Sequence, residues 1–197
     1  MALASHLVLS AYGFWLPNDP RGSWSDFVGA YKLYQFGHAT RTTSRHSVAG
    51  APHDAEARLS AKKALKYPPI LFSGFQARAI GRGFAECVRG VGLTIWACAI
   101  LSDHAHMVIA EHRLSPDQVA NLLKGGSTRR LVREGIHPLA AFPTRTGRLP
   151  KAWARGQWKV FLDTPEEVRC AIAYVEANPP RQGLPPQRWS FVTPYEG

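Results

Sequence analysis

Two histidines, His104 and His106, stand one residue apart at the start of the apolar stretch HAHMVIA, residues 104–110. Side chains alternate between the two faces of a strand, so both imidazoles project to one face while Ala105 and Met107 project to the other. A neutral imidazole is a common ligand of transition metals and also serves divalent sites that oxygen donors and phosphate complete. The pair therefore indicates a metal site, although two polar residues at the entrance of a strand would give the same pattern.

A tyrosine and an asparagine, Tyr174 and Asn178, lie four residues apart in a segment with the pattern of an amphipathic helix. The capping sequence Thr164-Pro-Glu-Glu167 predicts where this helix begins, and Pro179-Pro180 predicts its end after Asn178. Its expected core stripe consists of Val168, Ala171, Ile172 and Val175. Tyr174 and Asn178 then share a flank of that stripe. They either face the histidine strand or serve as an ordinary boundary tyrosine and a capping asparagine.

The charge of the chain favours a polyanionic partner. Its 24 Lys and Arg residues outnumber 14 Asp and Glu residues, giving a formal net charge of +10. A helix that begins at Ser115-Pro-Asp-Gln118 and continues through Leu131 carries a basic group: Lys124, Arg129, Arg130 and Arg133. Three tryptophans are candidates for stacking on unpaired bases or for packing in the core: Trp24, Trp153 and Trp158. The basic group is the stronger indication of nucleic-acid binding.

Cysteine usage and hydropathy exclude several protein classes. Cys87, Cys98 and Cys170 form no C-x-x-C pair, so the sequence indicates neither a disulfide framework nor a cysteine zinc site, and we expect small buried hydrophobes. The longest apolar run, Ile95 to Leu101, is far shorter than the roughly 20 residues that span a bilayer. The first ten residues lack the pattern of a signal peptide. We therefore expect a cytoplasmic protein with no membrane partner.

Strands and helices mix without strict alternation, which predicts an α+β fold with an antiparallel central sheet flanked by helices. The expected strands are His6–Leu16, Leu93–Leu101, His106–Glu111 and Trp153–Leu162, with a hairpin at Ser102–Asp103. Besides the two helices above, we expect one over Ser73–Val91, with Gly81 and Gly83 weakening it, and a short one near Asp54–Leu65. Residues 1–197 are expected to form a single domain, with an irregular excursion over residues 23–69.

The order and spacing of these motifs resemble those of the HUH single-tyrosine transposases. The stretch YVEANPPRQGL, from Tyr174 to Leu184, is similar to the REP-associated branch of that family. The stretch YGFWLPNDPRG, from Tyr12 to Gly22, resembles one seen in some members. The resemblance covers most of residues 5–35 and 70–184 and implies the ferredoxin-like fold of HUH endonucleases. The chain departs from the family pattern at Ser102-Asp103, where Pro-Asn is usual. It also departs at Ala105, where a bulkier residue is usual, and at Pro180, where valine is usual.

The resemblance implies a metal-dependent endonuclease and strand transferase that acts on single-stranded DNA. His104, His106 and Asn178 would hold Mg²⁺ or Mn²⁺, and Tyr174 would attack the scissile phosphate to give a 5′-phosphotyrosine. The basic group on the helix after Ser115 resembles the family's basic helix in placement. The implied partner is single-stranded or hairpin DNA at the bacterial nucleoid, and both homodimers and monomers occur in the family.

Two other functions remain open at this point. The departures from the family pattern are also compatible with a catalytically inactive or domesticated DNA-binding regulator on the same fold. An RNA-binding ferredoxin-like module would need stacking aromatics on the central strands, where this chain has His104, His106 and Met107. The intact histidines and tyrosine favour the enzyme.

The group that would take the proton of the tyrosine is not identified by the sequence. Asp103, Glu111 and Glu176 are close to the motifs, but strand parity places Asp103 and Glu111 on the face opposite the histidines. His112 shares the parity of His106, so it either supports that residue or lies at a solvent-facing strand end, and we expect the latter.

Overall fold

The computed structural model describes residues 2–17, 19, 31–37 and 52–197. Trp24 and most of the turn cluster over residues 17–22 lie outside these ranges, as does much of the predicted excursion. The elements, in chain order, are β1 (Ala4–Ser10), α1 (Tyr31–Tyr34), α2 (Ala55–Lys63), α3 (Gly74–Val91), β2 (Ile95–Ile100), β3 (His104–Ala110), α4 (Pro116–Arg133), β4 (Trp158–Leu162) and α5 (Pro165–Arg181).

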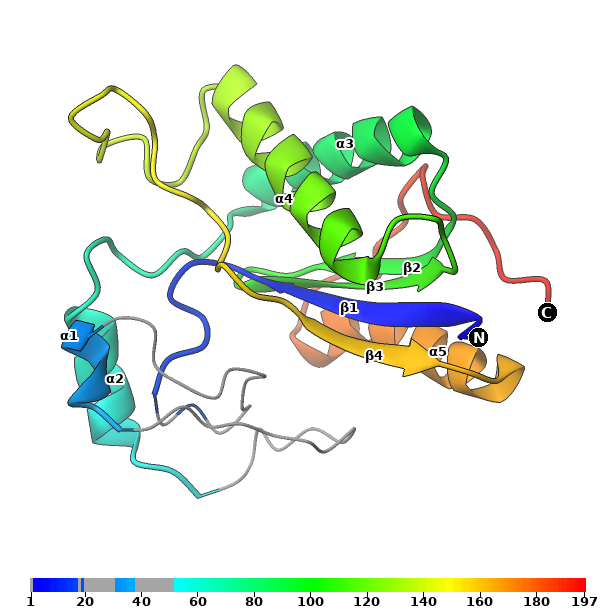
Figure 1. Ribbon diagram of the computed structural model, residues 1–197, viewed down its shortest axis with the longest axis horizontal. Helices are drawn as coiled ribbons and strands as arrows, with labels where there is room; N and C mark the ends of the chain where they lie inside the picture. The colour runs from blue at the N-terminus through cyan, green and yellow to red at the C-terminus, as the bar shows by residue number, and fades with distance from the viewer. Residues whose placement is uncertain (1, 18, 20–30, 38–51) are drawn as a thin grey trace.

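The four strands form one antiparallel sheet in the order β2-β3-β1-β4. Together with α3 and α4, the strands follow the β-α-β-β-α-β sequence of ferredoxin-like folds. Helices α3 and α4 cover one face of this sheet, and α5 covers the other (Figure 1). The predicted α+β class with an antiparallel central sheet is confirmed.

The two faces of β3 have different roles. Ala105, Met107 and Ile109 are buried in the core beneath α3 and α4. The alternate positions, His104, His106 and Val108, face α5, where Val108 packs in a smaller apolar cluster with residues of that helix. The parity expected for the two histidines is thus confirmed, and one strand supplies both the main core and the polar face.

Capping sequences fix where the long helices begin. Ser115 and Gln118 form a complete capping box at α4, and Thr164 and Glu167 form one at α5, as expected. At α3 the capping box is formed by Ser73 with Gln76. These boxes satisfy backbone N–H groups that would otherwise have no partner.

Glycines bring α3 and α4 into close contact instead of only weakening α3. A Cβ atom on Gly83 would lie 2.6 Å from Cα of Ser127, and one on Gly126 would lie 2.2 Å from Sγ of Cys87. A Cβ on Gly81 would meet the ring of Trp189 at 2.2 Å. Glycine inside a helix reduces its stability, but these glycines permit close packing that any residue with a Cβ atom would prevent.

Several predicted boundaries are wrong. β1 ends at Ser10 instead of Leu16, and β4 begins at Trp158 instead of Trp153. Trp153 is a core residue whose Nε1 donates to Oγ of Ser127 at 3.0 Å. α5 continues through Pro179 and Pro180 to Arg181, since the prolines fall in its last turn, where the amide of Gln182 donates to the carbonyl of Asn178 at 3.2 Å.

Two further expectations concern cysteines and membranes. Cys87 and Cys98 are buried, as expected, whereas Cys170 is exposed on α5. Among the described residues, no helix combines the length and apolar character that crossing a membrane would require.

Candidate metal and nucleophile site

Three imidazoles meet on the face of the sheet that α5 covers. Nε2 of His104 lies 2.8 Å from Nε2 of His106, and Nδ1 of His106 lies 3.1 Å from Nε2 of His6. His6 comes from β1, where it stands diagonally across from His106 because His106 pairs with Val8. The first two histidines were expected to share this face, and His6 is an addition that sequence reasoning missed.

The remaining ring nitrogen of His104 is held by a carboxylate. Nδ1 of His104 lies 2.6 Å from Oδ1 of Asp103, and since a carboxylate accepts, the imidazole donates. This contact leaves the lone pair of His104 at Nε2, the atom that faces His106. The expected placement of Asp103 on the opposite face is wrong, because Asp103 lies in the hairpin before β3 begins and strand parity does not apply there.

Burial keeps two of these rings, those of His6 and His106, neutral. His6, His104 and His106 are each less than a tenth exposed. Burial lowers the pKa of His6 to about 4. The pKa of His106 is held well below 6.5, mainly by burial and then by the neighbouring His104 and His6. At neutral pH the rings of His6 and His106 therefore carry lone pairs, as a metal site requires of a histidine ligand.

Tyr174 of α5 lies against the same cluster. Its ring centroid is 5.6 Å from that of His106 and 5.8 Å from that of His6, both in edge contacts. The side chain is 38% exposed, so a ligand can reach it while its ring remains packed. The guanidinium carbon of Arg181 lies 5.9 Å from the centroid of the Tyr174 ring. The phenol of Tyr174, the guanidinium of Arg181 and the imidazoles of His6 and His106 are therefore close to one another.

Asn178 is buried one turn beyond Tyr174. Its Nδ2 donates to the carbonyl oxygen of Tyr174 at 2.9 Å, which leaves Oδ1 as the atom that could coordinate an ion. A C-terminal proline pair follows it inside the helix, so Asn178 does not cap α5 as the alternative interpretation of the sequence suggested.

The residues present fit a divalent ion held by His104 and His106. Mg²⁺ prefers octahedral coordination, in which neighbouring ligand atoms about 2.1 Å from the ion lie about 3 Å apart, close to the 2.8 Å between these Nε2 atoms. On β1, opposite His104, Oγ of Ser10 is buried without a hydrogen-bond partner among the described residues. Within the described part of the chain, no three His, Cys, Asp or Glu side chains form a metal site, so an ion would need the amide oxygen of Asn178 or other donors besides the pair.

Lys124, the first member of the basic group on α4, is a buried structural residue. Its Nζ donates to the carbonyl oxygens of Ala154 at 3.0 Å and Gly156 at 2.6 Å. Its charge is therefore directed into the protein and is not presented to a ligand.

The arginines of the basic group differ in their exposure. Arg130 is paired with Glu86 at 2.8 Å and with Glu134. The more exposed cations of the group are Arg129 and Arg133, although the 62% exposed side chain of Arg133 also pairs with Glu86 at 3.4 Å. Within the basic group, only these two present their charge mainly to solvent.

The two described candidate tryptophans, Trp153 and Trp158, also differ in their exposure. Trp153 belongs to the core and is 3% exposed, which excludes base stacking. Trp158, at the start of β4, is half-buried, and its ring makes an edge contact of 5.2 Å with His6. Trp158 therefore lies beside the candidate site.

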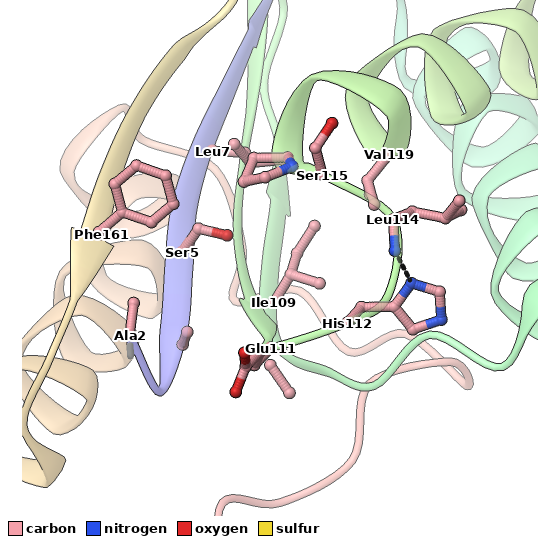
Figure 2. A pocket seen from close by; sticks show the side chains of 13 residues that line it. Ala2, Ser5, Leu7, Ile109, Glu111, His112, Leu114, Ser115, Val119 and Phe161 are labelled. Carbon is pink, nitrogen blue, oxygen red and sulfur yellow. Dashed lines mark hydrogen bonds between the residues drawn. The ribbon is translucent and has the colours of Figure 1, made fainter.

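A cavity of about 200 Å³ lies elsewhere, where Ser5 and Leu7 of β1 and Ile109 of β3 face the first turn of α4 (Figure 2). His112 lines this cavity, its Nδ1 accepting from the amide of Leu114 at 3.1 Å and its Nε2 donating to the carbonyl of Val91 at 3.2 Å. His112 thus serves the loop after β3 and does not support His106. The cavity is mostly apolar and lies on the α3/α4 face, across the sheet from the histidines.

No protein-family model and no curated protein matches the chain. A solved structure of a REP-associated tyrosine transposase bound to a REP hairpin is similar, with a TM-score of 0.47 and 11% sequence identity. The likeness covers 92% of this chain and 69% of that chain. At this identity and TM-score the match assigns no activity to the protein.

Proposed function

We propose that this protein is a metal-dependent endonuclease and strand transferase for single-stranded DNA, with Tyr174 as its nucleophile. The observation that carries the proposal is the contact between the Tyr174 ring and His106, 5.6 Å between centroids, beside two Nε2 atoms that converge to 2.8 Å. A hydroxyl nucleophile next to an ion site that can withdraw charge from a phosphate is an arrangement suited to phosphodiester transfer.

His104 and His106 would hold Mg²⁺ or Mn²⁺, with Oδ1 of Asn178 as a third protein ligand. The bound cation would withdraw charge from the scissile phosphate and thus favour attack on phosphorus. The hydrogen bond from Nδ2 of Asn178 to the Tyr174 carbonyl ties the amide ligand to the residue that reacts.

The reaction exchanges one phosphate ester for another. The phenolic oxygen of Tyr174 forms a bond to phosphorus, and the bond from phosphorus to the 3′-oxygen breaks. The phenolic proton is transferred overall to the departing oxygen, which leaves a 3′-hydroxyl strand and a 5′-phosphotyrosine. Attack by another 3′-hydroxyl reverses the step and joins strands without a nucleotide cofactor. Arg181, whose guanidinium lies beside the Tyr174 ring, would place positive charge near the transferring phosphate.

A DNA strand that reaches both Tyr174 and the exposed arginines of α4 must pass an edge of the sheet, because α4 and α5 cover opposite faces (Figure 1). The β4 edge is the better path. It carries the half-buried Trp158, which touches His6, and Lys159, which is 30% exposed and paired with Asp117. We propose hairpin DNA with a single-stranded flank as the substrate, bound by a monomer or a homodimer.

A DNA-binding regulator without catalysis is the rival function. The departures at Ser102-Asp103 and Pro180 are the observations that favour it. Such a regulator would bind the same DNA but would form no covalent bond to it.

The two functions are separated by incubating the protein with end-labelled single-stranded DNA and Mn²⁺ and resolving the products on a denaturing gel. We expect a covalent adduct with the wild type and none with Tyr174→Phe, which keeps the ring but removes the nucleophile. Tyr195→Phe is the matched control, because Tyr195 packs against Trp96 away from the histidines. An adduct that persists in Tyr174→Phe contradicts the assignment, and no adduct with the wild type favours the regulator.

A further inference from the structure

His6 is a buried imidazole that the proposed reaction does not use. It is 6% exposed, and its ring stacks on that of His106 with 5.3 Å between centroids. Its edge contacts reach Trp158 and Tyr174, so it is enclosed by the residues of the site. A polar ring buried in such a place needs a hydrogen-bonding role.

The geometry does not make His6 a direct ligand of the ion. Its Nε2 meets Nδ1 of His106 at 3.1 Å, whereas the Nε2 atom of His106 faces His104. Nδ1 and Nε2 are separate nitrogens of the imidazole ring, and the one that contacts His6 is not the one that would bind an ion. His6 therefore acts on the ion only through the His106 ring.

Hydrogen-bond directions in the ion-free cluster follow from Asp103. When His104 is the neutral imidazole that donates from Nδ1 to this carboxylate, its Nε2 is an acceptor and Nε2 of His106 must donate to it. Neutral His106 then carries its proton on Nε2 and accepts at Nδ1 from Nε2 of His6. Each ring therefore donates to the next partner in turn: His6 to His106, His106 to His104, and His104 to Asp103.

An ion at the two Nε2 atoms requires the opposite arrangement in His106. Its Nε2 must present a lone pair, so its proton moves to Nδ1, and only an acceptor at Nδ1 satisfies that proton in a buried site. Nε2 of His6 becomes that acceptor when His6 carries its own proton on Nδ1. The change is balanced, since each ring keeps one proton and no charge is created.

We propose that His6 is a positioning residue for the ion: it accepts the Nδ1 proton of His106 and thereby directs the Nε2 lone pair of His106 to the metal. Asp103 has the same role for His104, since its carboxylate accepts from Nδ1 of that ring. Each histidine ligand thus has its own partner at Nδ1, a carboxylate for His104 and an imidazole for His106. The proposal rests on the proposed metal site. It predicts that the chain loses ion affinity without His6, although His6 never touches the ion.

Ion affinity of the full chain, without DNA, tests this role. Mn²⁺ binding is followed by electron paramagnetic resonance of free Mn²⁺ in the wild type, His6→Phe, His6→Gln and the control His112→Phe. We expect His6→Phe to raise the Kd roughly 10- to 100-fold, as loss of such a partner does in other metal sites. The amide oxygen of glutamine can accept from Nδ1, so His6→Gln should recover most of the affinity. His112→Phe, which alters a histidine bonded to loop backbone, should leave the Kd unchanged.

A second measurement needs no variant. Nitrogen-15 NMR of the imidazoles in the wild type, without ion and with saturating Mg²⁺, should show the His106 proton moving from Nε2 to Nδ1. A proton that stays on Nε2 of His106 in the saturated protein overturns the role of His6.

The outcomes distinguish this inference from the proposed function. If the wild type binds Mn²⁺ and His6→Phe binds it equally well, the role of His6 is overturned while the metal site stands. If the wild type binds neither Mn²⁺ nor Mg²⁺, the metal-dependent function fails, and the role of His6 fails with it. If His6→Phe loses affinity and His6→Gln restores it, the positioning role is supported, because simple damage to packing would not be repaired by a smaller polar chain.

Discussion

Nζ of Lys124 lies 2.6 Å from the carbonyl oxygen of Gly156, which joins the middle of α4 to the segment before β4. The same ammonium group donates to the carbonyl of Ala154 and to Oε1 of Gln157 at 3.2 Å. Burial lowers its pKa to about 8. A lysine that the sequence grouped with DNA-contacting cations therefore holds together two segments of the fold.

Replacing this lysine should reduce stability more than DNA binding. Lys124→Met keeps an unbranched chain but leaves the carbonyls of Ala154 and Gly156 without a donor. We expect the free energy of unfolding in urea to fall by about 2–4 kcal/mol. DNA affinity of the folded variant, measured well below its unfolding midpoint, should stay near the wild-type value. A large loss of affinity at unchanged stability would restore Lys124 to the DNA-contacting group.

The exposed arginines of α4 should show the opposite behaviour. Arg129→Ala with Arg133→Ala should weaken binding of single-stranded DNA and reduce the log-log salt slope by about 0.7 for each phosphate that the variant no longer neutralises. The comparison variant is Arg89→Ala with Arg113→Ala, which removes the same charge from exposed positions elsewhere. Fluorescence anisotropy at several salt concentrations measures both quantities. Equal effects of the two double variants would mean that only net charge matters.

The histidine pair should govern ion binding and leave DNA affinity intact. His104→Ala with His106→Ala removes the two converging Nε2 atoms, so Mn²⁺ binding measured by calorimetry and adduct formation should both disappear. DNA affinity should change little, because phosphate contacts by Lys and Arg dominate it. Full cleavage by the wild type in excess EDTA would refute the metal assignment, and equal loss of DNA binding and cleavage in the double variant would show that the histidines are structural.

The buried histidines should make the metal-free protein sensitive to acid. Burial lowers the pKa of His6 from 6.5 to about 4, so between these values the unfolded chain binds a proton that the folded protein excludes. Stability is thus fully present above pH 6.5 and decreases as the pH falls toward about 4, with His6 contributing up to about 3 kcal/mol. The lowered pKa of His106 acts in the same direction.

Urea denaturation at about pH 7.5 and at about pH 5 measures this dependence. In His6→Phe the decrease in unfolding free energy between the two should be smaller than in the wild type. An identical decrease would show that His6 titrates normally in the folded protein or that other groups control the acid transition.

Features that depend on residues close together in the sequence could be predicted, whereas features that depend on the pairing of distant strands could not. The common face of His104 and His106 follows from the two-residue period of a strand, and the starts of α4 and α5 follow from their capping boxes. His6 could not be placed at the site because the register between β1 and β3 is fixed by contacts far apart in the chain.

Two local rules also gave wrong results where the backbone departs from regular structure. Parity excluded Asp103 from the site, yet Asp103 lies in the hairpin and reaches His104. The proline pair was expected to end the last helix at Asn178, yet the helix continues to Arg181, which brings that guanidinium beside Tyr174. Both errors concern residues at the end of an element, where sequence rules are weakest.

The alternation along β3 also limits how this chain can change in length. Deleting Ala105 would turn one imidazole into the apolar layer beneath α3 and α4 and separate it from the other. Changes of two residues at a time would preserve both faces but displace the pairing with Val8 and Ser10. We therefore expect relatives of this protein to tolerate insertions on either side of β3 but to keep the number of residues between its two histidines fixed.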